Sequence, residues 1–180
     1  DALGWERADL LGHSMGGAIA CTLAAAMPAR VRRLGLVEAL GPVAGDPAKA
    51  GERLRQAAAA RRSKPARPPR TLPDLDTAVA ARLAATRMAP DAARLIVERN
   101  LRAVPGGYQW RSDPRLTWPS HLRLGEDTVQ SLLRAIEAPA WLVAADPSPP
   151  YFSPEVRAGR LACLREIHVA VLPGGHHLHM

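Results

Sequence analysis

The sequence predicts an α/β fold, in which a parallel sheet carries an inserted helical segment. Short apolar runs bounded by glycine and charged residues are typical of buried parallel strands, and such runs occur near both ends of the 180-residue chain. Between them lies a long stretch with helical patterns and many prolines, where we expect no strand. Helices packed on the faces of a parallel sheet would bury strands of this kind.

A βαβ unit opens the chain. Residues 7–13 (RADLLGH) and 32–40 (RRLGLVEAL) are predicted strands, and residues 16–27 between them form an alanine-rich segment that Pro28 should end. Strand, helix and strand within some thirty residues match the spacing of a parallel crossover unit.

The same alternation returns at the end of the chain. We expect strands at residues 139–145 (PAWLVAA) and 165–172 (REIHVAVL), each preceded by a helix, at residues 125–136 and 153–164. The second of these helices starts with Ser153 and Pro154, a common helix N-terminus. The sheet is therefore predicted to have about four strands.

The middle of the chain is predicted to be a helical cap. Residues 47–63, 72–88 and 89–104 have helical patterns, with proline-rich joints between them. We assign residues 1–43 and 120–180 to the sheet-containing core and residues 44–119 to a cap or lid. Such an insertion is expected near the carboxyl edge of the sheet, where open α/β folds bind ligands.

Charge and composition narrow the class of partner. The net charge of +7 would suit nucleic-acid binding, but the basic residues are almost all arginine and only 4% of residues are aromatic, which leaves little for bases to stack on. We expect a small-molecule substrate, with no nucleic-acid partner, no membrane span and no cofactor. Cys21 and Cys163 are isolated, which favours a reducing, cytoplasmic location.

A nucleophile motif lies at the junction of the first strand and helix. Gly12, His13, Ser14, Met15 and Gly16 match G-x-S-x-G in the strand-turn-helix context that gives the motif its meaning. Ser14 should occupy a strained turn with its hydroxyl exposed above the sheet. Gly12 and Gly16 are expected to be glycines because a Cβ at either position would collide with the neighbouring strand and helix. Gly17 is expected to let the helix pack closely. The Met15 N–H would then face a substrate oxyanion.

A serine hydroxyl needs a base to take its proton, and the last strand is followed by a histidine doublet. We favour His176, the first residue after Gly174 and Gly175, and keep His177 as the alternative. A metal site is not expected, because no cysteine or carboxylate adjoins the cluster. The acid that orients the base has two candidates, Glu38 after the second strand and Asp146 after the third.

Together these residues resemble the α/β-hydrolase superfamily. The terminal segment GGHHLH and the segment GGYQWRSDPRLTWPS are similar to the serine hydrolase-like branch. In some relatives, notably the haloalkane dehalogenases, the acid ends the strand after the elbow helix, about two dozen residues beyond the nucleophile. Glu38 occupies that position, so the resemblance favours Glu38 over Asp146.

The resemblance implies a serine hydrolase that cleaves a carboxylic ester, thioester or similar carbonyl compound through an acyl-enzyme. Carbon–carbon bond hydrolysis, cofactor-free perhydrolysis and a non-catalytic ligand-binding scaffold remain alternatives on the same fold. The family fold has eight strands, of which we predict only the second half here. We therefore expect this chain to be an internal piece of a longer protein, inactive alone where a second oxyanion donor is required.

Overall fold

The chain forms two compact units in the computed structural model, which describes residues 4–63, 70–86, 88–147 and 149–180. One unit comprises residues 1–47 and 123–179, and the other comprises residues 48–122. Residues 1–3 and 64–69, together with Arg87 and Ser148, belong to the predicted segments but lie outside the described residues.

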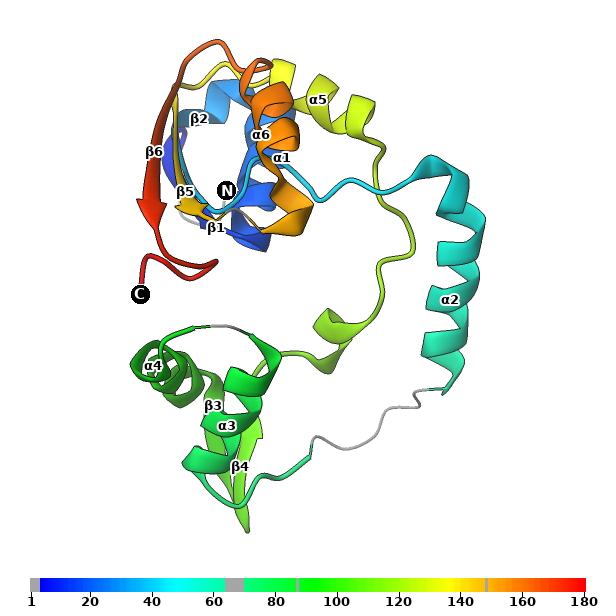
Figure 1. Ribbon diagram of the computed structural model, residues 1–180, viewed down its shortest axis with the longest axis vertical. Helices are drawn as coiled ribbons and strands as arrows, with labels where there is room; N and C mark the ends of the chain where they lie inside the picture. The colour runs from blue at the N-terminus through cyan, green and yellow to red at the C-terminus, as the bar shows by residue number, and fades with distance from the viewer. Residues whose placement is uncertain (1–3, 64–69, 87, 148) are drawn as a thin grey trace. The chain divides into compact units, whose positions relative to one another are not determined.

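The first unit contains a four-stranded, wholly parallel sheet of order β1-β2-β5-β6 (Figure 1). Its strands are β1 (Ala8–His13), β2 (Val31–Val37), β5 (Ala140–Asp146) and β6 (Ile167–Pro173). This confirms the predicted α/β class and the parallel sheet of about four strands. Because all strands run the same way, the segments that carry Ser14, Glu38 and His176 all follow carboxyl ends on one edge of the sheet.

Three helices accompany this sheet: α1 (Met15–Ala26), α5 (Glu126–Arg134) and α6 (Pro154–Leu161). Helix α6 starts as predicted, because the Ser153 hydroxyl accepts a hydrogen bond from the Val156 N–H. Three-residue 3₁₀ turns lie at Pro28–Arg30 (η1), Pro47–Lys49 (η2) and Pro150–Phe152 (η4).

The core lies between one face of the sheet and these helices. Leu34, Leu36 and Leu142 point from the strands to meet Cys21 of α1 and Leu133 of α5, and all five are at most 1% exposed. Side chains packed this closely leave little room for the strands to shift relative to the helices. Strand β1 lies at the edge of the described sheet, where Leu11 is 81% exposed.

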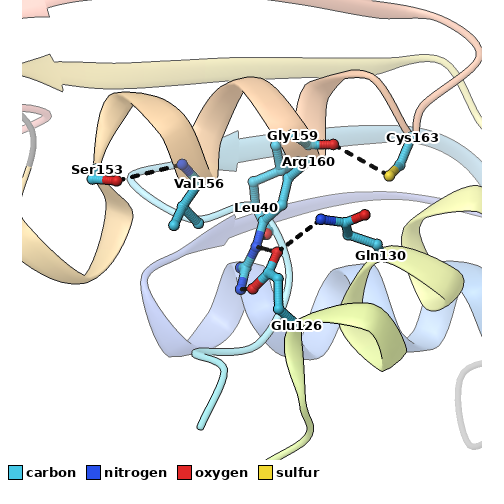
Figure 2. A network of polar contacts seen from close by, with 8 residues as sticks. All are labelled: Leu40, Glu126, Gln130, Ser153, Val156, Gly159, Arg160 and Cys163. Atoms are coloured by element: carbon cyan, nitrogen blue, oxygen red, sulfur yellow. Dashed lines mark hydrogen bonds and ion pairs between the residues drawn. The ribbon is translucent and has the colours of Figure 1, made fainter. Parts of the chain in front are cut away.

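An ion pair between a buried arginine and a partly exposed glutamate links the helices of this unit to the segment after Glu38. The Arg160 guanidinium, on α6, donates hydrogen bonds to both carboxylate oxygens of Glu126 at 2.9 and 2.7 Å and to the Leu40 carbonyl at 2.7 Å (Figure 2). Arg160 is only 3% exposed, so these bonds satisfy a charge that would otherwise be costly to bury. The hydrogen bonds hold the pKa of Glu126 below its usual value.

The second unit contains helices α2 (Ala50–Ser63), α3 (Leu75–Ala85) and α4 (Pro90–Asn100), with a short 3₁₀ turn, η3 (Pro114–Thr117). Its own small core includes Val79, Val97 and Leu101. Asp74 starts α3 by accepting a hydrogen bond from the Thr77 N–H at 2.7 Å. Within the described residues, no helix has both the length and the apolar character needed to cross a bilayer.

The expectation that this segment has no strand was wrong. Strand β3 (Leu101–Val104) lies where we predicted the end of a helix, and it forms an antiparallel hairpin with β4 (Gly107–Trp110). Glycine is required at the start of β4, where Gly107 has φ +140° and a Cβ would lie 2.0 Å from the Leu72 carbonyl oxygen. The helical pattern ends at Asn100 because the pairing of β3 with β4 and the bridge between Leu72 and Tyr108 favour extended backbone.

Candidate active site

Ser14 occupies a strained turn between β1 and α1. Its φ of 54° lies in the left-handed region that residues with a Cβ rarely adopt. The Ser14 N–H donates to the Val37 carbonyl at 3.0 Å, and the Ser14 carbonyl accepts from the Ala18 N–H at 3.1 Å. Bonds to the neighbouring strand and to the first helical turn therefore hold the backbone in this conformation.

Gly12 and Gly17 have the roles we expected, and Gly16 does not. A Cβ on Gly12 would lie 2.5 Å from the backbone of Gly16 and Gly17, and one on Gly17 would lie 2.6 Å from the Ala39 Cβ. Both must be glycine for α1 to start this close to the strands. The collision that we expected at Gly16 was wrong, because a Cβ there would have no atom outside its own helix within 4 Å.

His176 lies in the turn after β6 and reaches the serine. Its Nε2 is 2.8 Å from the Ser14 Oγ, a hydrogen-bond distance. His177, the alternative base, instead packs its ring against those of His13 and His176, with centroids 5.0 and 5.2 Å away. Of the doublet, the structure thus brings His176 to the serine.

Glu38 lies on the other side of the imidazole. Its Oε2 is 3.5 Å from the His176 Nδ1, and its Oε1 accepts a hydrogen bond from the Ala145 N–H. The Glu38 backbone also has a positive φ, 50°, and its N–H donates to the Val143 carbonyl at 2.9 Å. Bonds to β5 from both backbone and side chain thus orient a carboxylate that is only 1% exposed.

Asp146, the alternative acid, is not part of this group. It ends β5 as an exposed residue, and its backbone carbonyl accepts a hydrogen bond from the Gly174 N–H at 3.2 Å. Among the described residues, no hydrogen bond or ion pair joins its carboxylate to His176. Its backbone, rather than its side chain, supports the turn that carries the base.

Two further side chains, those of His13 and Tyr151, contact His176. The His13 Nε2 lies 2.7 Å from the His176 carbonyl oxygen, so a protonated Nε2 donates to it. Burial lowers the pKa of His13, which favours the neutral ring. The Tyr151 hydroxyl lies 3.0 Å from the His176 Nδ1. The sequence signal for either was proximity: His13 adjoins the nucleophile, and Tyr151 follows β5, the neighbour of the strand that precedes the base.

Met15, the expected oxyanion donor, is the first residue of α1. A backbone N–H at this position has no partner within the helix and lies at the positive end of the helix dipole. Its side chain is 62% exposed and lines an apolar groove of about 480 Å³ along α1 with Ile19, Leu23 and Pro42. No group of three or more His, Cys, Asp or Glu residues in the described part of the chain could hold a metal ion.

Comparison with known proteins places the chain in a family. The sequence profile of the alpha/beta hydrolase fold matches residues 1–180. A serine hydrolase-like protein of Dictyostelium discoideum is 29% identical over 195 residues, which cover 100% of this chain and 53% of that protein.

Solved structures of other proteins have a similar fold. A hypothetical protein of Pseudomonas aeruginosa PAO1 superposes with a TM-score of 0.88 at 41% identity, over 99% of this chain and 63% of its own. The thioesterase domain from the curacin biosynthetic pathway superposes with a TM-score of 0.70 at 25% identity, over 97% of this chain and 61% of its own. The chain thus spans between 53% and 63% of the length of these relatives. The match over all 180 residues shows that this chain belongs to the α/β-hydrolase fold family.

Proposed function

We propose that this chain carries the catalytic residues of a serine hydrolase that cleaves a small-molecule ester, thioester or similar carbonyl compound. The observation that carries the proposal is the 2.8 Å contact between the Ser14 Oγ and the His176 Nε2, with Glu38 on the far side of the ring. The relatives support the same chemistry, since they include a serine hydrolase-like protein and a thioesterase domain.

The reaction follows from the roles that these distances allow. The Ser14 Oγ attacks the substrate carbonyl carbon while its proton passes to the His176 Nε2, giving a tetrahedral oxyanion and an imidazolium. The buried Glu38 carboxylate stabilises that imidazolium, and the Met15 N–H donates to the oxyanion. His176 then returns the proton to the leaving group, and water releases the acyl group from Ser14 by the same steps.

The test is hydrolysis of p-nitrophenyl acetate, butyrate and octanoate, and of an acyl thioester, by the protein that carries this chain. We expect Ser14→Ala to lower kcat by roughly 10³-fold or more. Ser131→Ala, on the exposed side of α5, is the matched control and should leave kcat unchanged. Equal hydrolysis by Ser14→Ala and the parent protein would overturn the proposal. Binding without turnover of any of these substrates would favour the non-catalytic scaffold instead.

A further inference from the structure

His13 links the nucleophile elbow to the backbone of the base. It is the last residue of β1, directly before Ser14, and it pairs with Val37 in the parallel sheet. Its Nε2 lies 2.7 Å from the carbonyl oxygen of His176, which is 163 positions further along the chain. This contact therefore joins a strand of the sheet to the turn that carries the base.

The acceptor fixes the direction of this hydrogen bond. A carbonyl oxygen cannot donate, so the His13 Nε2 must carry the hydrogen. Burial lowers the pKa of His13, and its ring is therefore neutral near neutral pH, with a hydrogen on Nε2 and a lone pair on Nδ1. The imidazolium could make the same bond, so the essential feature is a donor at the position of Nε2.

The turn that carries the base gains an anchor from this bond. Gly174 and Gly175, which directly precede the base, are exposed and have no side chains to pack. The Gly174 N–H donates to the Asp146 carbonyl at 3.2 Å, and the Leu178 N–H donates to the Gly175 carbonyl at 3.0 Å. The bond from His13 lies between these two along the chain, and it holds the peptide of the base itself.

The His13 ring also contacts the other rings of this turn. Its centroid lies 4.8 Å from that of His176, 5.0 Å from that of His177 and 4.2 Å from that of His179. Ring contacts of this kind restrict the turn, but a hydrogen bond of 2.7 Å is more directional. The hydrogen bond therefore determines where the backbone of the base lies.

We propose that His13 is a positioning residue, whose Nε2–H bond to the His176 carbonyl holds the base at hydrogen-bond distance from Ser14. This inference rests on the proposed serine hydrolase activity. Because the bond goes to the backbone of His176, it leaves the ring Nε2 to Ser14 and the ring Nδ1 to Glu38. Reaction rates depend steeply on such placement, since a displacement of about 1 Å can cost roughly 10²-fold.

Three substitutions of His13 separate the hydrogen bond from the shape of the ring. In His13→Gln the side-chain NH₂ can lie where Nε2 lies now, whereas the shorter side chain of His13→Asn places it near the position of Nδ1. His13→Phe keeps a ring but has no donor. His168→Asn is the matched control, because His168 is an exposed histidine on β6 that stacks on Trp141.

The readout is hydrolysis of p-nitrophenyl butyrate by the protein that carries this chain, with thermal unfolding to verify that each variant is folded. We expect His13→Asn and His13→Phe to lower kcat roughly 10- to 100-fold, from the loss of one hydrogen bond and the displacement that follows. His13→Gln and His168→Asn should stay within about threefold of the parent kcat. KM should change less than about twofold in all four variants, because the bond holds the base and not the substrate.

Three results would overturn the inference. A parent kcat in His13→Asn or His13→Phe would mean that the bond is not needed. A His13→Gln variant as slow as His13→Asn would mean that a donor at this position does not restore the function. Failure of His13→Asn and His13→Phe to fold would make the role of His13 one of folding.

Ser14→Ala measured in parallel separates these failures from that of the proposed function. If Ser14→Ala is as active as the parent protein, the hydrolase proposal itself fails and the inference about His13 fails with it. If Ser14→Ala is inactive and His13→Asn and His13→Phe keep the parent kcat, only the inference about His13 fails.

Discussion

Replacing Glu38 with Gln removes one negative charge from the site while keeping the shape of the side chain. The amide oxygen of Gln can still accept the hydrogen bond from the Ala145 N–H. Its NH₂ group would then face the His176 Nδ1, where a donor meets a donor and the wrong imidazole tautomer is favoured. The substitution therefore tests the acid with little change in packing.

The size of the effect follows from the geometry. The Glu38 Oε2 lies 3.5 Å from the His176 Nδ1. Two unit charges at this distance attract by roughly 5 kcal/mol when the effective dielectric constant is about 20. This attraction exists only when the ring is an imidazolium, so its loss raises the barrier by a similar amount. At about 1.4 kcal/mol for each factor of ten, kcat should fall roughly 10³-fold.

The assay is steady-state hydrolysis of p-nitrophenyl butyrate, with thermal unfolding to verify that each variant is folded. Glu166→Gln is the matched control, because Glu166 lies 3.6 Å from the His168 Nε2 in an exposed pair. Exposed pairs contribute little, so this control should keep the parent kcat. Asp146→Asn should also keep it. Loss of activity in Asp146→Asn, with Glu38→Gln active, would refute the assignment of the acid.

Three further predictions concern folding and reactivity. Gly12→Ala should lower the free energy of unfolding in urea by about 2 kcal/mol or more, because its Cβ would lie 2.5 Å from backbone atoms. Gly16→Ala should change the same free energy by less than about 1 kcal/mol. Equal effects of the two substitutions would contradict this prediction. Arg160→Met should lower the free energy of unfolding by about 1 to 3 kcal/mol in the same assay, because it removes the hydrogen bonds to Glu126 and to the Leu40 carbonyl. Because Arg160 lowers the pKa of Glu126, this pair stabilises the fold at pH values above the ordinary glutamate pKa of 4.5. The stabilisation is lost as the pH falls through the lower pKa of the folded state. If the stability of Arg160→Met depended on acidic pH as that of the parent protein does, the prediction would be contradicted. The Cys21 thiol, whose pKa burial raises to about 11, should react with iodoacetamide at pH 8 far more slowly in the folded protein than in urea, and equal rates would refute its burial.

Much of the sheet could be predicted because its strands are nearly continuous apolar runs. Leu34 and Leu36 on β2 and Leu142 on β5 are buried against helices, and burial of this kind gives a strong local pattern. The β3–β4 hairpin has only four residues in each strand, and its first strand continues the apolar spacing of α4. Local pattern could not distinguish the two there, because the pairing of β3 with β4 and the bridge between Leu72 and Tyr108 decide the outcome.

The site shows the same division between local and distant information. The elbow is local, so Ser14 and the need for Gly12 could be inferred from neighbouring residues. The choice between Glu38 and Asp146 depends on the register of β2 with β5 and on the positive φ of Glu38. Neither the register nor the backbone conformation can be read from the sequence. The contact between Tyr151 and His176 is also hidden in the sequence, because it depends on how the turn after β5 lies against the turn after β6.

The most direct test of the central claim is the labelling of Ser14 by a fluorophosphonate, measured by peptide mass spectrometry in His176→Ala and His177→Ala variants. The structure brings only the first of these imidazoles to 2.8 Å from the serine Oγ. We predict that His176→Ala slows formation of the Ser14 adduct by roughly 10³-fold or more, while His177→Ala stays within a few-fold of the parent rate. An adduct on another residue, or rapid labelling of Ser14 without His176, would contradict the account.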